Sequence, residues 1–140
     1  MILFILQNAY TSEKHLFKNE DEWYRELMRS HTGRRLKEMI PYGKDFRVVN
    51  SSATIGDNPN SIYPADINHI CKMIDNIKPK VICACGKVAQ AGCRKINIEK
   101  LKIDYIEAPH PAWRGLSKKI ILDIRAKLNI ACLTNEFNYL

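Results

Sequence analysis

The sequence has no apolar run long enough to cross a membrane. A membrane-spanning helix needs about 20 consecutive apolar residues, whereas the apolar stretch Met1–Leu6 meets polar residues at Gln7. No basic residue precedes that stretch, so it also lacks the layout of a secretory signal peptide. We therefore expect a cytoplasmic protein, either bacterial or phage-encoded and located in the host cytoplasm, with no membrane partner.

The chain is too short for a second domain of ordinary size, and it has fewer acidic than basic residues. With 140 residues, of which 46% are hydrophobic, the chain fits one globular domain over residues 1–140. The 15 acidic residues are outnumbered by 22 lysines and arginines, which gives a formal net charge of +7. This surplus favours a polyanionic partner, with nucleic acid ahead of an anionic surface such as a lipid headgroup layer. A generally basic surface is the alternative.

The cysteines do not indicate a disulfide framework or a metal centre. There are five, an odd number in a chain without a secretory segment, which is typical of reduced thiols. Cys83 and Cys85 would share one face of a strand, but no second close pair follows at the spacing of a zinc site. We expect these cysteines to be small core residues and expect no metal.

Strand and helix signals alternate along the chain. Apolar runs predict four buried strands, and amphipathic segments predict helices between them. The predicted strands lie in 1–6, 46–50, 78–86 and 102–111, and the predicted helices start near Asn19 or Asp21, break at Thr32-Gly33, and resume over 34–40, 64–77, 87–96 and 117–129. Parallel strands need helical crossovers, so this order predicts a single α/β domain with a central, mainly parallel four-stranded sheet flanked by helices.

Polar side chains follow three of the predicted strands at the point where each strand ends. Gln7 and Asn8 follow the first strand, Asn50 ends the second, and His110 closes the fourth. The carboxyl ends of parallel strands lie on one rim of a sheet, where open α/β proteins bind their ligands. The sequence therefore predicts a site at this rim.

Three segments carry these residues and resemble a known family in order and position. They are LQNAY at 6–10, VVNSSATI at 48–55 and APHPAWRGLS at 108–117. They resemble the signature segments of the uracil-DNA glycosylase superfamily, which classically run Gly-Gln-Asp-Pro-Tyr, a strand ending in Asn, and His-Pro-Ser. HTGRRL at 31–36 and KPKVICACGKVAQ at 78–90 are similar to connecting segments of related branches. The resemblance implies a three-layer sandwich of that family and an enzyme that flips a base out of DNA.

The resemblance also implies roles for the rim residues. Asn50 would read the O4 and N3–H of a pyrimidine, and His110 would hydrogen-bond O2 of the departing base. Gln7 would line the pocket, and Tyr10 would exclude the methyl group of thymine. The alternatives are structural: a strand-end amide for Asn50, a turn histidine for His110 and a core tyrosine for Tyr10.

Several positions depart from the classical pattern, among them Ala9, which replaces the usual proline. Asn8 stands where classical members carry the aspartate that supports the attacking water, although mismatch-specific thymine/uracil glycosylases also carry asparagine there. A neutral amide can position water but cannot favour a cationic sugar as a carboxylate does. Ala112 replaces a serine that clamps a phosphate, and Ser117 or backbone amides are the candidate substitutes.

The resemblance further predicts a DNA-binding set. Trp113 and Arg114 occupy the place of the residues that wedge into the DNA stack. Arg34, Arg35 and Lys118 are candidate phosphate contacts, and a solvated charged face is the alternative for each.

These features predict a monofunctional DNA glycosylase, acting in DNA repair, that hydrolyses the N-glycosidic bond of uracil or a modified pyrimidine. It would use Asn8 and His110, need no cofactor, bind DNA and act as a monomer. The alternative is a catalytically weakened protein on the same fold that binds DNA or a modified base. An α/β enzyme acting on a small nucleotide would explain the rim but not the basic surplus.

Overall fold

Four parallel strands form one sheet in the order β2-β1-β3-β4. The computed structural model describes residues 1–9, 19–58 and 60–137. The strands are β1 (Ile2–Leu6), β2 (Phe46–Asn50), β3 (Val81–Cys85) and β4 (Asp104–Ala108). The helices are α1 (Glu20–Arg29), α2 (His31–Met39), α3 (Ile67–Ile77), α4 (Lys87–Arg94) and α5 (Lys118–Phe137), with a 3₁₀ turn at Glu99–Leu101.

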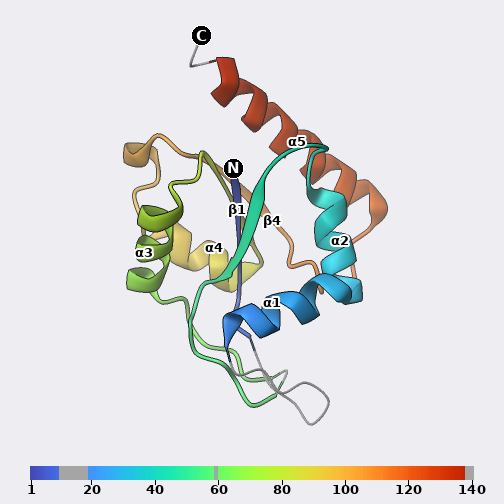
Figure 1. Ribbon diagram of the computed structural model, residues 1–140, viewed down its shortest axis with the longest axis vertical. Helices are drawn as coiled ribbons and strands as arrows, with labels where there is room; N and C mark the ends of the chain where they lie inside the picture. The colour runs from blue at the N-terminus through green and yellow to red at the C-terminus, as the bar shows by residue number, and fades with distance from the viewer. Residues whose placement is uncertain (10–18, 59, 138–140) are drawn as a thin grey trace.

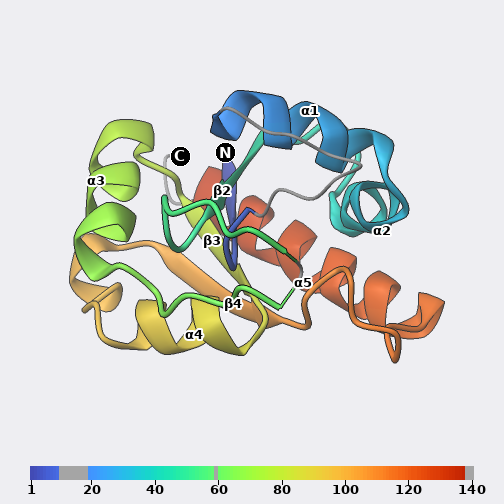
Figure 2. The ribbon, with the colours of Figure 1, turned by 90° about the horizontal axis from the view of Figure 1, so that it is seen from below.

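Helices cover both faces of this sheet and form a three-layer sandwich (Figures 1 and 2). On one face, Phe4 and Cys83 pack with residues of α1, α2 and α5; on the other, Leu3 and Ile82 pack with α3 and α4. All five residues of β1 and of β3 are buried, because these central strands are covered on both sides. The predicted α/β class with a parallel four-stranded sheet is confirmed.

The junction between α1 and α2 differs from the prediction. Asn19 caps α1 by accepting a hydrogen bond from the backbone of Glu22, as its sequence position suggests. The expected break at Thr32-Gly33 is wrong, however, because the helices meet at Ser30 and Gly33 lies inside α2. A Cβ on Gly33 would collide with the carbonyl oxygen of Leu27, so glycine allows the two helices to approach closely.

Two helix boundaries also lie outside their predicted places. Asp66 caps α3, so Pro64 precedes the cap instead of lying in the first turn. The last helix extends to Phe137, well beyond the predicted end at 129. Among the described residues, no helix is long and apolar enough to cross a membrane.

The cysteine pair on β3 belongs to the core. Cys83 and Cys85 are fully buried on one face of the strand, with their Sγ atoms 3.9 Å apart. The neighbouring thiol and burial both raise the pKa of Cys85 well above its usual value. Both side chains therefore pack as small core residues, as predicted.

Candidate functional site

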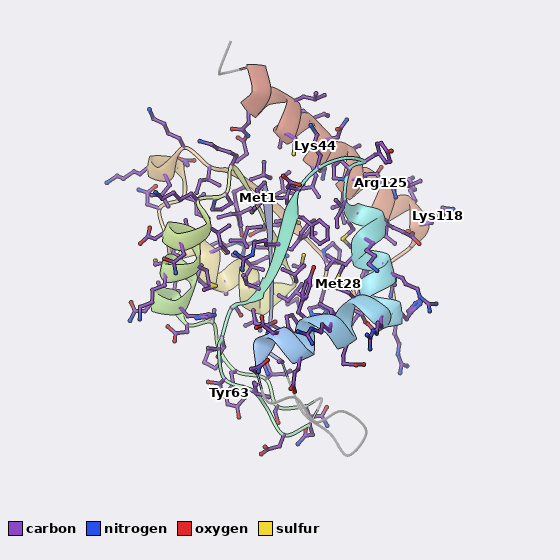
Figure 3. The ribbon with its side chains drawn as sticks, viewed as in Figure 1. Met1, Met28, Lys44, Tyr63, Lys118 and Arg125 are labelled. Atoms are coloured by element: carbon purple, nitrogen blue, oxygen red, sulfur yellow. The ribbon has the colours of Figure 1, made fainter. Side chains whose placement is uncertain are left out.

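The carboxyl ends of the strands form one rim, seen end-on in Figure 2 with the loop of residues 51–63 in front of it. Gln7 and Asn8 follow β1, Asn50 ends β2, and His110 follows β4. Tyr63, labelled in Figure 3, lies at this end of the molecule. The structure thus brings the predicted rim residues to one edge.

Asn50 is the most unusual of these residues because its buried amide is unpartnered. Only 1% of the residue is exposed, and among the described residues neither Nδ2 nor Oδ1 has a hydrogen-bond partner. It lies opposite Leu6 in the sheet and two residues after Val48, which places it on the face covered by α1, α2 and α5. An unsatisfied buried amide costs about 1–3 kcal/mol. A strand-end asparagine bonded to its own loop would avoid that cost, so the purely structural alternative does not describe Asn50.

Asn8, in contrast, is occupied by backbone groups. Its Nδ2 donates to the carbonyl oxygens of Ala9 and Ser61, both at 2.9 Å, and its Oδ1 accepts from the backbone N–H of Tyr63 at 3.3 Å. These three bonds leave one lone pair on Oδ1. The side chain is 9% exposed. Asn8 therefore fastens the 51–63 loop to the end of β1, and, with respect to the part of the chain that the structure describes, the remaining acceptor of Oδ1 is the group left to hold water.

Further hydrogen bonds join the same loop to the segment after β1. Ser51 donates its backbone N–H to Leu6 O at 2.9 Å and its hydroxyl to Gln7 O at 2.8 Å, and Ser52 N–H reaches Gln7 O at 3.2 Å. Gly56 N–H donates to Ala9 O at 2.8 Å. The backbone of Gln7 is thereby fixed, and its half-buried side chain lies at the rim.

His110 is held as a neutral hydrogen-bond donor. Its Nδ1 accepts from the backbone N–H of Ala112 at 3.0 Å, and burial lowers the pKa of the imidazole below its ordinary value. With Nδ1 serving as an acceptor, the proton of the neutral ring lies on Nε2. Nε2–H can therefore donate to a ligand without carrying a positive charge.

Gly86 and Gln90 support this arrangement and were not identified as site residues from the sequence. Gly86 has a φ of 89°, and a Cβ there would lie 3.2 Å from the Cβ of His110. Gln90 donates its side-chain amide to Ala108 O at 2.9 Å, which ties α4 to the end of β4. The available signal was a glycine between a buried strand and a helix, a position that often needs a positive φ.

Asn50 and His110 stand at nearby points of the rim. His110 follows an edge strand, but its contact with Gly86 places it beside the end of β3. Only β1 lies between β2 and β3, so the backbones at Asn50 and Gly86 are about two strand spacings, or about 10 Å, apart.

The predicted wedge residues lie on the turn that follows His110. Trp113 N–H donates to His110 O at 2.9 Å, and the indole lies against Gly115. Half of Trp113 remains exposed, and Arg114 is exposed beside it. The turn thus presents an aromatic and a cationic side chain to solvent.

The predicted phosphate contacts divide into free and engaged groups. Arg34 and Lys118 are exposed, and Figure 3 shows Lys118 at the start of α5, beside α2. Arg35 instead donates to Leu116 O at 2.5 Å and so joins α2 to the turn before α5. Ser117 caps α5 by accepting from the backbone N–H of Ile120 at 3.2 Å, which leaves its hydroxyl proton available.

Tyr10, the predicted methyl-excluding residue, lies outside the described residues. Among the residues that are described, no group of three His, Cys, Asp or Glu side chains could hold a metal ion.

Comparison of the chain with protein-family models, with curated proteins and with solved structures finds no match. The resemblance to the uracil-DNA glycosylase superfamily therefore depends on the sequence segments themselves.

Proposed function

We propose that this protein is a monofunctional DNA glycosylase that removes uracil or a modified pyrimidine from DNA. The observation that carries the proposal is the buried, unpartnered amide of Asn50 at the carboxyl rim. A buried polar group without a partner is rare in proteins, and a ligand that supplies the missing bonds explains it. The resemblance of the segments at 6–10, 48–55 and 108–117 to the superfamily supplies the ligand class.

Recognition follows from the chemistry of the amide. Asn50 offers a donor and an acceptor side by side, which match the O4 and N3–H of uracil. Cytosine presents the opposite pattern at those two positions. A base flipped into the rim would restore both missing hydrogen bonds of Asn50, and this gain offsets part of the cost of unstacking the base.

Bond cleavage would depend on His110. As the N-glycosidic bond breaks, its electron pair moves into the base, and negative charge develops at O2. The neutral Nε2–H donates to that oxygen and stabilises the charge. Water attacks the sugar carbon and loses a proton to the solvent, and the departing base anion takes up a proton from the solvent, which leaves an abasic site and the free base. The remaining lone pair of Asn8 Oδ1 is the candidate acceptor for that water.

DNA would contact the exposed groups around the rim. Trp113 and Arg114 would enter the space left by the flipped base, and Arg34, Lys118 and the Ser117 hydroxyl would bind phosphates. We place this activity in DNA repair and in the cytoplasm, where the five free cysteines would stay reduced, and we expect a monomer.

One observation favours a second candidate function. Asn8 Nδ2 donates two hydrogen bonds and Oδ1 accepts one, all with backbone groups, so a single acceptor lone pair remains for catalysis. A protein that recognises a base through Asn50 without cutting would need no more than this. The alternative is therefore a DNA- or modified-base-binding protein on the same fold.

Base release separates the two functions. Duplex and single-stranded oligonucleotides carrying one uracil, a thymine mismatch or 5-hydroxymethyluracil are incubated with the protein and then treated with alkali. An enzyme yields alkali-sensitive strands that disappear with His110→Gln and Asn50→Leu. Intact strands on every substrate, together with retained DNA, would leave the binding protein as the function.

A further inference from the structure

The amino-terminal edge of the sheet carries a cluster of exposed lysines. The segments before β3 and β4, residues 78–80 and 99–104, hold four lysines against two acidic residues. We call the four the amino-edge lysines: Lys78, Lys80, Lys100 and Lys102, all exposed. The segments adjoin each other, because the N–H of Asp104 donates to the carbonyl oxygen of Lys80 at 3.0 Å. The four lysines therefore belong to two adjoining segments at one edge of the sheet.

These lysines lie at the opposite edge of the sheet from the candidate site. Figure 3 labels Met1 and Lys44, which precede β1 and β2, in the upper half of the molecule, and Tyr63 near its lower end. The strands are parallel, so the amino-edge lysines lie at the same edge of the sheet as Met1. The five-residue strands separate this edge from the rim by about 17 Å.

Two of these lysines adopt a backbone conformation that does not suit lysine. Lys78 has φ 52° and ψ 55°, and Lys102 has φ 56° and ψ 39°. They are the only non-glycine residues with positive φ in the described part of the chain. Glycine and asparagine adopt this left-handed region far more easily. Both positions therefore carry a lysine at some cost in backbone energy.

Local stabilisation explains only one of the two. Lys78 follows the C-terminus of α3, where a positive charge is favourable, but Lys102 ends a three-residue 3₁₀ turn that has no comparable dipole. In the described residues, no carboxylate forms an ion pair with Lys78, Lys100 or Lys102. The carboxylate of Asp104 instead accepts from Asn135 Nδ2 at 2.6 Å.

We propose that the amino-edge lysines bind the phosphate backbone of a second DNA segment. Ammonium groups on flexible stems suit phosphates in any sequence, and each contact releases counterions from the DNA. The chain would then hold one segment at the rim and another at the amino edge. Binding of DNA at the rim rests on the proposed function, whereas binding of DNA by the amino-edge lysines does not.

The test uses a double variant that keeps the fold. Lys78→Asn with Lys102→Asn removes two charges and places a residue that tolerates left-handed backbone, so the Tm is expected to stay the same or rise. The matched control, Lys72→Gln with Lys127→Gln, removes two charges from exposed positions of α3 and α5. An undamaged duplex is immobilised, loaded with protein and rinsed, and the capture of a second, labelled duplex is measured.

The wild type and the control are expected to capture the second duplex, and the Lys78→Asn/Lys102→Asn variant to load equally but capture about 10-fold less. Wild-type loading without capture by a protein whose Lys78→Asn/Lys102→Asn variant loads equally, or undiminished capture by the variant, would overturn the proposal. If the rim does not bind DNA, the amino edge becomes the loading surface, and the variant fails to load. That result would support the amino-edge surface while removing the rim from the proposed function.

Discussion

His110 packs closely against Gly86, so a Cβ at position 86 would make a tight contact with the histidine. A Cβ on Gly86 would lie 3.2 Å from His110 Cβ and 3.6 Å from His110 Cδ2. The backbone of Gly86, at φ 89° and ψ 166°, also falls in a region that is almost restricted to glycine. One glycine therefore sets both the turn from β3 into α4 and the position of the proposed leaving-group donor.

Gly86→Ala is expected to lower the free energy of unfolding by about 1–3 kcal/mol and to slow base release, because it strains the turn and displaces His110. Urea unfolding and the alkali assay measure the two effects. Gly43→Ala is the matched control, since Gly43 also has positive φ, at 74°, but has open space around its Cβ position. Equal loss of activity in both variants would show that Gly86 does not act through His110.

Asn8→Asp is expected to destabilise the protein without accelerating base release, although it recreates the classical residue of the family. Its carboxylate would face the carbonyl oxygens of Ala9 and Ser61, to which Nδ2 now donates. We expect a loss of about 1–3 kcal/mol in the free energy of unfolding. The control is Asn58→Asp, at an exposed position of the same loop. Asn58 Oδ1 accepts a hydrogen bond from the N–H of Asn60, and an aspartate can accept the same bond. A stable Asn8→Asp protein with faster base release would show that the bonds from Asn8 Nδ2 to Ala9 O and Ser61 O do not decide which residue position 8 accepts.

Asn50→Leu is expected to raise the free energy of unfolding by about 1 kcal/mol while removing base recognition. The substitution deletes two unsatisfied polar atoms from a buried position and replaces them with an apolar side chain of the same branched shape. Asn50→Asp is the opposite case, because it buries a charge and is expected to destabilise the protein strongly. Urea unfolding of the three proteins checks that the free energy of unfolding is highest for Asn50→Leu, intermediate for the wild type and lowest for Asn50→Asp. A destabilised Asn50→Leu would indicate that the amide makes structural bonds in solution.

The stability contribution of His110 is expected to depend on pH in one direction. Burial lowers its pKa in the folded protein, whereas the unfolded chain has the ordinary value of about 6.5. Between the two values the unfolded chain binds more protons than the folded protein. The stability contribution of His110 is therefore constant above about pH 6.5 and falls as the pH drops from there through the folded pKa. The difference in free energy of unfolding between wild type and His110→Gln, measured from about pH 5 to pH 8, reports this term. A difference that grows with rising pH above 7 would contradict the assignment.

Two adjacent arginines are expected to separate DNA binding from stability. Arg34→Gln should leave the free energy of unfolding within about 0.5 kcal/mol of wild type. It should also reduce the slope of the logarithm of the DNA-binding constant against the logarithm of the salt concentration by about 0.9. Arg35→Gln should lower the free energy of unfolding by about 1 kcal/mol, because the arginine now donates to Leu116 O. If both variants retain full stability, Arg35 does not hold the turn before α5.

The sequence was sufficient to predict the layers and the convergence of Asn50, His110 and Asn8 at one rim. Buried strands alternating with amphipathic helices restrict the sheet to parallel crossovers, and parallel strands share their carboxyl edge. The partners of Asn8 could not be predicted in this way. Ser61 and Tyr63 lie more than 50 residues away along the chain, and only the folded loop brings them together.

Local signals also failed where tertiary contacts decide the outcome. Gly33 looks like a helix breaker in the sequence, but it lies inside α2. Its lack of a side chain lets α2 pack closely against Leu27 of α1. The residues after 129 show weak periodicity, yet α5 continues to Phe137 and reaches β4 through the Asn135–Asp104 hydrogen bond.

The central claim is that Asn50 reads a base, and equilibrium binding tests it most directly. The dissociation constants of duplexes that differ only in one uracil, thymine mismatch or 5-hydroxymethyluracil are compared with that of an undamaged duplex, with the strands checked for integrity afterwards. We predict that the wild type prefers one of these duplexes by about 10-fold or more, and that Asn50→Leu binds all of them with the affinity of undamaged DNA. A wild type without preference, or a preference that survives Asn50→Leu, would contradict the account.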